Sequence, residues 1–225
     1  MYQPMLYLHW KQIRVALIPL VVASFGLPLV AVSGLGASPG MTYTSLNVYA
    51  ILNLSSFWLP VFPILAVAVG FTLALSAWNW DHRLGHVYAL SLPLTRMEYA
   101  LLKMGAGMTL ALLPAMALWL GAHVAAAAVA LPEGLNTYPN QLAFRFLIAV
   151  MMAYSALFAM ASGTVKTTLW IVGLTSAFVL IGLMTSDLLG AGSWHLDIVG
   201  DIIEWLFEGS GPFRIFTGNW SLIDV

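Results

Sequence analysis

Long apolar runs, separated by short polar or charged segments, dominate the chain. Five of these runs have about 20 residues or more, the length that an α-helix needs to cross the hydrocarbon of a bilayer. They predict membrane spans over residues 15–34, 57–77, 101–130, 142–162 and 169–189. We therefore expect an all-α fold, a polytopic transmembrane helix bundle that forms one domain over residues 1–225.

The two ends of the chain have a mixed pattern. Residues 1–14 combine Tyr7 and Trp10 with Lys11 and Arg14, which is typical of an interfacial helix, although a simple flank of the first span fits equally well. Residues 190–225 contain four acids at helical spacing, which predict an amphipathic helix lying on a membrane surface. These acids are Asp197, Asp201, Glu204 and Glu208.

Composition supports a membrane protein and removes other classes. The chain is 61% hydrophobic and only 8% charged, whereas a soluble domain has about 25% charged residues. The net charge of −1 gives no reason to expect a nucleic-acid partner. The absence of cysteine excludes disulfide and thiolate chemistry and selects no compartment.

The basic residues predict the orientation of the spans. Placing the N-terminus in the cytoplasm puts six of the eight lysines and arginines on or beside cytoplasmic segments. These six are Lys11, Arg14, Arg83, Arg96, Lys103 and Lys166. Loops 35–56 and 131–141 then face outward with no basic residue. Five spans leave the C-terminus and the acidic helix after the fifth span outside the cell.

The charged stretch 78–103 lies between two predicted spans and is the most distinctive part of the chain. It predicts a short helix, a corner at Pro93, and a second helix that begins at a capping box formed by Thr95 and Glu98. A rigid corner joined to a span suits the transmission of force from a partner. The alternative is a loop that merely satisfies the positive-inside rule.

This stretch resembles the cytoplasmic segment of the ABC type-2 exporter permeases. In that family R-x-G is followed by a leucine-rich helix and then by L-P-[VLI]-[ST]-R-x-E-x-x-x-x-K before the third span. The matching positions here are Arg83, Gly85, Leu92, Pro93, Thr95, Arg96, Glu98 and Lys103.

The resemblance implies a function and a set of partners. In the family this segment is the coupling helix, which docks on a separate ATPase subunit, and two permease chains form the pathway. It implies partner-coupling roles for Arg83, Gly85, Pro93, Thr95, Arg96, Glu98 and Lys103. The partner would bind ATP and Mg, and this chain would bind no cofactor. The resemblance also implies a multi-pass protein of the cell membrane, which in bacteria is the plasma (inner) membrane.

The resemblance also raises the question of a sixth span. The family returns its C-terminus to the cytoplasm through a sixth span, and here no apolar run follows residues 219–225. Either the sequence is cut at the start of that span or the protein has five spans, and we favour the cut.

Other candidate sites have weaker support. His82 and His86 have a metal-compatible spacing, but no further ligands accompany them, so we expect no metal. The segment around residues 163–167 lacks the glycines that a phosphate loop requires before its lysine. We therefore expect that this chain has no ATPase activity of its own. We expect His123 to bond to a neighbouring carbonyl, and we expect Arg145 and Asp187 to reach headgroups rather than a substrate or a partner chain.

Three functions remain open from the sequence. The chain is a permease driven by a separate ATPase, a structural or assembly subunit of a larger membrane complex, or an intramembrane enzyme. The lack of a converging acid–base or metal cluster disfavours the enzyme. We expect the permease.

Overall fold

The computed structural model has four long helices. It describes residues 2–33, 58–83, 94–129, 131, 134–163, 170, 173, 177, 201, 204–208, 211 and 213–224. The helices are α1 (Tyr2–Ser33), α3 (Val61–Arg83), α5 (Arg96–Ala128) and α6 (Pro139–Ala161). All four are long and apolar enough to cross a membrane, which confirms a mostly helical, membrane-type fold.

Several predicted features lie wholly or largely outside the described residues. They are the loop 35–56, most of the span 169–189, Gly85, Pro93, Asp197 and Lys166. Of the predicted amphipathic helix, residues 201 and 204–207 are described and are helical. Its position on a membrane surface stays a prediction.

The chain divides into two compact units. One unit comprises Met1–Phe158 together with Asn219–Val225, and the other comprises Ala159–Gly218. In the second unit the short helix α9 (Arg214–Thr217) follows a cluster of aromatic rings. The centres of the Phe207 and Phe213 rings are 5.5 Å apart, and Thr217 Oγ1 donates to the carbonyl of Phe207 at 2.5 Å.

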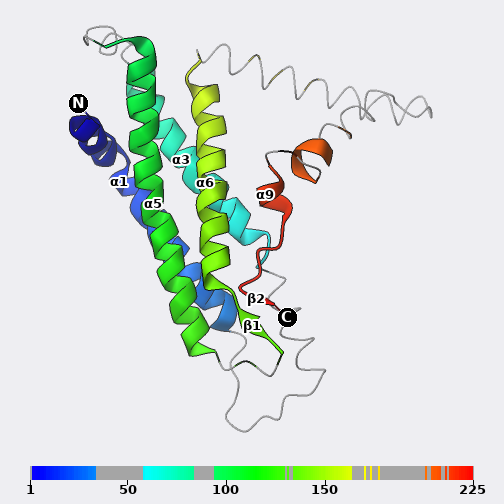
Figure 1. Cartoon of the computed structure of the whole chain (residues 1–225). Helices are drawn as coiled ribbons and strands as arrows, with labels where there is room; N and C mark the ends of the chain where they lie inside the picture. The colour runs from blue at the N-terminus through cyan, green and yellow to red at the C-terminus, as the bar shows by residue number, and fades with distance from the viewer. Residues whose placement is uncertain are drawn as a thin grey trace. The chain divides into compact units, whose positions relative to one another are not determined.

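In the first unit the four long helices pack side by side (Figure 1). Helix α1 runs parallel to α5, since Tyr2 at its start contacts Gly105 and Phe25 in its last third contacts Gly121. Helix α3 runs antiparallel to both, because His9 of α1 bonds to Ser76 near the end of α3. The ends of the helices that carry Lys11, Arg83 and Arg96 therefore lie at one end of the bundle.

Glycines allow these helices to approach closely. A Cβ on Gly70 would lie 2.8 Å from the Cβ of Ala153, a Cβ on Gly107 would collide with the hydroxyl of Tyr154, and one on Gly121 would collide with the carbonyl of Phe25. Small residues at helix contacts let backbones come together where hydrocarbon provides no hydrophobic drive. Each of these positions excludes a larger side chain without movement of its neighbour.

Helix α1 is continuous from Tyr2 to Ser33, which fits a flank of the first span, while a position of its first turns at a membrane interface stays a prediction. No break separates residues 1–14 from the first span. At about 1.5 Å per residue, its 32 residues measure about 48 Å, longer than the hydrocarbon core of about 30 Å. His9 of this helix is only 4% exposed, and its Nε2 lies 3.0 Å from Ser76 Oγ. Burial on α3 thus draws the first turns of α1 into the bundle.

A pair of short strands closes the other end of the bundle, which the all-α prediction did not include. Strand β1 (Asn136–Thr137) pairs antiparallel with β2 (Ile223–Asp224). Figure 1 shows both strands at the end where α5 finishes and α6 begins. The backbone N–H of Tyr138 also donates to the carbonyl of Leu222 at 2.9 Å, and Trp220 is buried. The C-terminal residues 219–224 are therefore fastened to the start of α6.

Candidate functional site

A buried ion pair joins α3 to α5 near the ends of both helices. Lys103 Nζ lies 2.5 Å from Asp81 Oδ2, and the two residues are 8% and 4% exposed. Asp81 comes two residues before the end of α3, whereas Lys103 lies two turns into α5. Ionisable residues within membrane segments are costly and mark functional sites by default.

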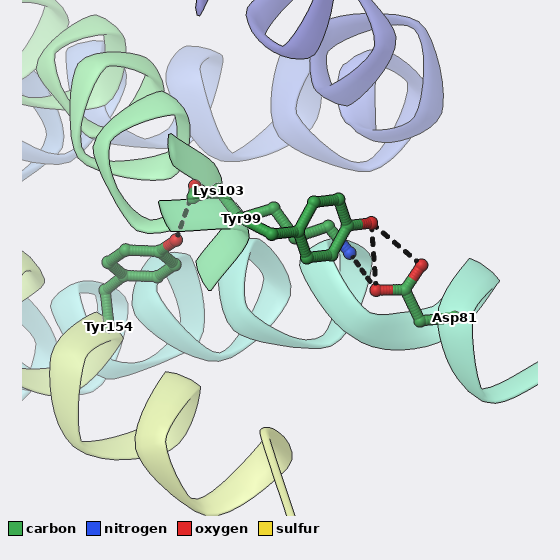
Figure 2. Close-up of polar contacts among 4 residues, drawn as sticks. All are labelled: Asp81, Tyr99, Lys103 and Tyr154. Atoms are coloured by element: carbon green, nitrogen blue, oxygen red, sulfur yellow. Dashed lines mark hydrogen bonds and ion pairs between the residues drawn. The ribbon is translucent and has the colours of Figure 1, made fainter. Parts of the chain in front are cut away.

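Aromatic side chains complete the environment of this pair. The hydroxyl of Tyr99 donates to the Asp81 carboxylate, 3.1 Å from either oxygen. The ammonium of Lys103 lies 4.7 Å from the centre of the Trp78 ring and 5.0 Å from that of the Tyr99 ring. Since a cation over an aromatic face is attracted by the ring quadrupole, both rings stabilise the buried charge. Figure 2 shows the carboxylate facing both donors.

Helical spacing explains why these residues converge. Tyr99 and Lys103 are four residues apart on α5, so both side chains lie on one face. Trp78 and Asp81 are three residues apart on α3 and share a face in the same way. Below them Tyr154 of α6 fits over Gly107, and its hydroxyl donates to the carbonyl of Lys103 at 3.3 Å (Figure 2). Three helices are therefore fixed around the pair.

The capping box predicted from the sequence is confirmed at the start of α5. The backbone N–H of Glu98 donates to Thr95 Oγ1 at 3.2 Å, and the backbone N–H of Thr95 donates to Glu98 Oε2 at 2.9 Å. Thr95 has the extended backbone of an N-cap. The helix that leads into the third predicted span thus begins at Arg96, as the pattern indicated.

The predicted partner-coupling residues divide into three groups. Thr95, Arg96 and Glu98 are exposed at the start of α5, where a partner can reach them. Lys103 is buried against Asp81, so it holds helices together and does not present its charge to a partner. Gly85, Pro93 and the side chain of Arg83 lie outside the described part of the chain.

Asp81 and Tyr99 were not predicted as members of the site. Asp81 and Lys103 are paired and buried, so these two charges of the stretch 78–103 are not exposed at the surface of the bundle. The sequence did contain a signal for this pair: an acid follows one predicted span and a lysine lies near the start of the next. Two opposite charges at neighbouring span ends suggest that they pair with each other.

Two predictions for polar residues at the other end of the bundle have different outcomes. His123 Nε2 lies 3.1 Å from the amide oxygen of Asn140, which also accepts from Trp119 at 2.9 Å, so its partner is a carbonyl oxygen as expected. The contact of Arg145 with headgroups stays a prediction, and the structure shows partners for it within the chain. Its guanidinium donates to the backbone carbonyl of Asn219 and lies 5.8 Å from the Trp220 ring.

The described residues hold no group of three or more acids or histidines able to bind a metal. The ion pair and hydrogen bonds among Asp81, Tyr99 and Lys103 connect α3 to α5. Comparison with protein-family models, with curated proteins and with solved structures returns no match. The resemblance to the exporter permeases therefore depends on the sequence motif alone.

Proposed function

We propose that the chain is the membrane permease subunit of an ATP-driven exporter. Two copies would form the translocation pathway, and a separate subunit would bind ATP and Mg and perform the hydrolysis. This chain would convert motion of that subunit into motion of its own helices. The motif from Arg83 to Lys103 motivates the proposal, and the geometry at its two ends supports it.

The observation that carries the proposal is the ion pair between Asp81 and Lys103. Residues 84–93 connect the end of α3 to the start of α5, and the pair holds these two helices together at that point. A force applied to the connecting segment would therefore act on α3 and α5 as one body. Without such a pair, motion of the connecting segment would shift single side chains and would not move the two helices together.

The capping box supports the same role. Reciprocal bonds between Thr95 and Glu98 satisfy backbone donors that the first turn of α5 leaves open. The first turn is therefore ordered up to the point where the connecting segment joins it. Exposed Arg96 at this turn supplies a cation for an acidic surface on the partner.

We further propose that residues 1–225 contain five spans, with the N-terminus in the cytoplasm. Lys11, Arg14 and Arg96 lie at one end of the bundle, as the positive-inside rule requires of a cytoplasmic end. Helix α6 begins at the opposite end of the bundle and runs toward the end proposed to be cytoplasmic. Residues 219–224 are hydrogen-bonded to the chain just before the start of α6. If α6 crosses the bilayer, the chain between residues 161 and 219 must cross it once more, which supports a fifth span.

Charge reversal at Arg96 tests the coupling role. The tagged chain is purified from its own membrane, and both the retained nucleotide-binding subunit and the ATPase activity are measured. Arg96→Glu should lose most of the retained subunit and of the activity. Folding should be unaffected, because a negative residue in the first turn of a helix is favoured by the helix dipole.

The matched control is Arg214→Glu, which reverses the charge of another exposed arginine on a short helix. It lies in the segment proposed to be outside the cell and should leave both measurements unchanged. Wild-type levels of partner and activity in Arg96→Glu would refute the coupling role. Equal losses in both variants would also refute it, since the effect would not be specific to the cytoplasmic end.

A further inference from the structure

A polar cavity of about 390 Å³ lies at the opposite end of the bundle from Asp81 and Lys103. One wall is formed by Tyr138 and by Gln141 and Arg145 of the following helix α6, and the other wall is the C-terminal segment. Its volume falls in the range of small-molecule sites, about 300–1,000 Å³. Six of its seven lining residues carry polar side chains, and Gln141 and Asn219 are exposed, so the cavity is open to solvent.

The C-terminal wall is held in place by its own hydrogen bonds. Asn219 Oδ1 accepts from the backbone N–H of Ser221 at 2.9 Å and from its hydroxyl at 2.7 Å. Asn219 Nδ2 donates to Asp224 Oδ2 at 2.6 Å. This wall is therefore ordered before any ligand arrives, and it presents one carboxylate to the cavity.

The α6 wall has donors that the described part of the chain does not use. The Tyr138 hydroxyl and the Gln141 amide make no hydrogen bond to any described residue. Arg145 uses one N–H for the carbonyl of Asn219, and Trp220 supports its guanidinium plane. A guanidinium has five N–H donors, so most of them remain for a ligand.

We propose that this cavity binds a zwitterionic group with a phosphate at one end and a primary ammonium at the other. A phosphate suits the planar fork of Arg145 together with the Tyr138 hydroxyl and the Gln141 amide. The carboxylate of Asp224 on the opposite wall disfavours a second anion and attracts the ammonium. Phosphoethanolamine has this chemistry, either as a lipid headgroup or as a free molecule. The proposal does not depend on coupling to an ATPase.

Binding is measured on the full-length chain in nanodiscs of phosphatidylcholine. In one arm O-phosphoethanolamine is titrated by calorimetry. In the other arm phosphatidylethanolamine is added to the nanodisc, and retained lipid is counted by native mass spectrometry. Binding in the first arm identifies a free ligand, and retention in the second arm alone identifies a lipid headgroup. The absence of both overturns the proposal.

Variants separate ligand binding from support of the C-terminal segment. Tyr138→Phe removes a hydroxyl that makes no described contact, so a purely structural role predicts no change in affinity. A hydrogen bond to a charged ligand predicts a loss of about tenfold. Wild-type affinity in both Tyr138→Phe and Arg145→Gln would overturn the site.

Inorganic phosphate tests the zwitterionic part of the proposal. Asp224→Asn should weaken the binding of O-phosphoethanolamine but leave inorganic phosphate unchanged or bound more tightly, because the mutation removes a repulsive charge. If inorganic phosphate binds the wild-type chain as tightly as O-phosphoethanolamine does, the ammonium contributes nothing and the proposal is overturned.

Discussion

Replacing Lys103 with methionine removes one charge of the buried pair and shortens the unbranched side chain by one atom only. At a separation of 2.5 Å and an effective dielectric constant of about 20, the attraction between the two charges is about 6–7 kcal/mol. Desolvation costs several kcal/mol for each ion, so the net contribution of the intact pair is small. Removing one partner alone leaves the other charge buried without compensation.

We therefore expect Lys103→Met and Asp81→Asn each to reduce the free energy of unfolding by about 3–5 kcal/mol. The double variant should be close to the wild type, because neither charge then remains buried. The assay is equilibrium unfolding of the purified chain in detergent micelles, analysed as a double-mutant cycle. The coupling energy of the cycle is the quantity that reports the pair.

The matched control is Lys11→Met, the same substitution at an exposed lysine of α1 at the same end of the bundle. It should change stability by less than about 0.5 kcal/mol. If Lys103→Met costs no more than Lys11→Met, or if the two charge removals are simply additive, Asp81 and Lys103 do not form a buried pair and the reasoning is refuted.

Three further predictions concern packing, capping and orientation. Gly107→Ala should destabilise the chain by about 1–3 kcal/mol, because the new Cβ would collide with the Tyr154 hydroxyl. Adding Tyr154→Phe should recover part of the lost stability in thermal unfolding, and no recovery would contradict this contact. Thr95→Ala should cost about 1 kcal/mol and speed amide exchange in the first turn of α5, whereas unchanged exchange there would argue against the cap. A cysteine at exposed Asn136 should react with a membrane-impermeant reagent on intact cells, whereas a cysteine at Thr95 should react only after permeabilisation. The reverse pattern would show that the proposed orientation is wrong.

The sequence predicted local features well. Thr95 and Glu98 are three residues apart, and a capping box depends only on that spacing and on the backbone between them. The long apolar runs likewise predicted the long helices, because length and hydropathy alone decide whether a helix can cross a bilayer. Both signals are contained in one short window of the chain.

The sequence did not predict contacts between distant segments. Asp81 and Lys103 are 22 residues apart, and Arg145 and Asn219 are 74 apart. Pairing over such distances depends on which helix faces turn toward each other, which no window of the sequence contains. Strands β1 and β2 have two residues each, too few for an alternating pattern to be recognised.

The continuity of α1 has a related explanation. The pattern of residues 1–14 fitted either an interfacial helix or a simple flank of the first span. The contact between His9 and Ser76 buries part of this segment against α3, a tertiary contact that the local pattern does not contain.

The composition of the purified complex tests the central claim most directly. The tagged chain is extracted from its own membrane in mild detergent, and the intact assembly is weighed by native mass spectrometry. A permease driven by a separate ATPase predicts two copies of this chain with two copies of a nucleotide-binding subunit. An assembly without any nucleotide-binding subunit, or the chain by itself, would contradict the account.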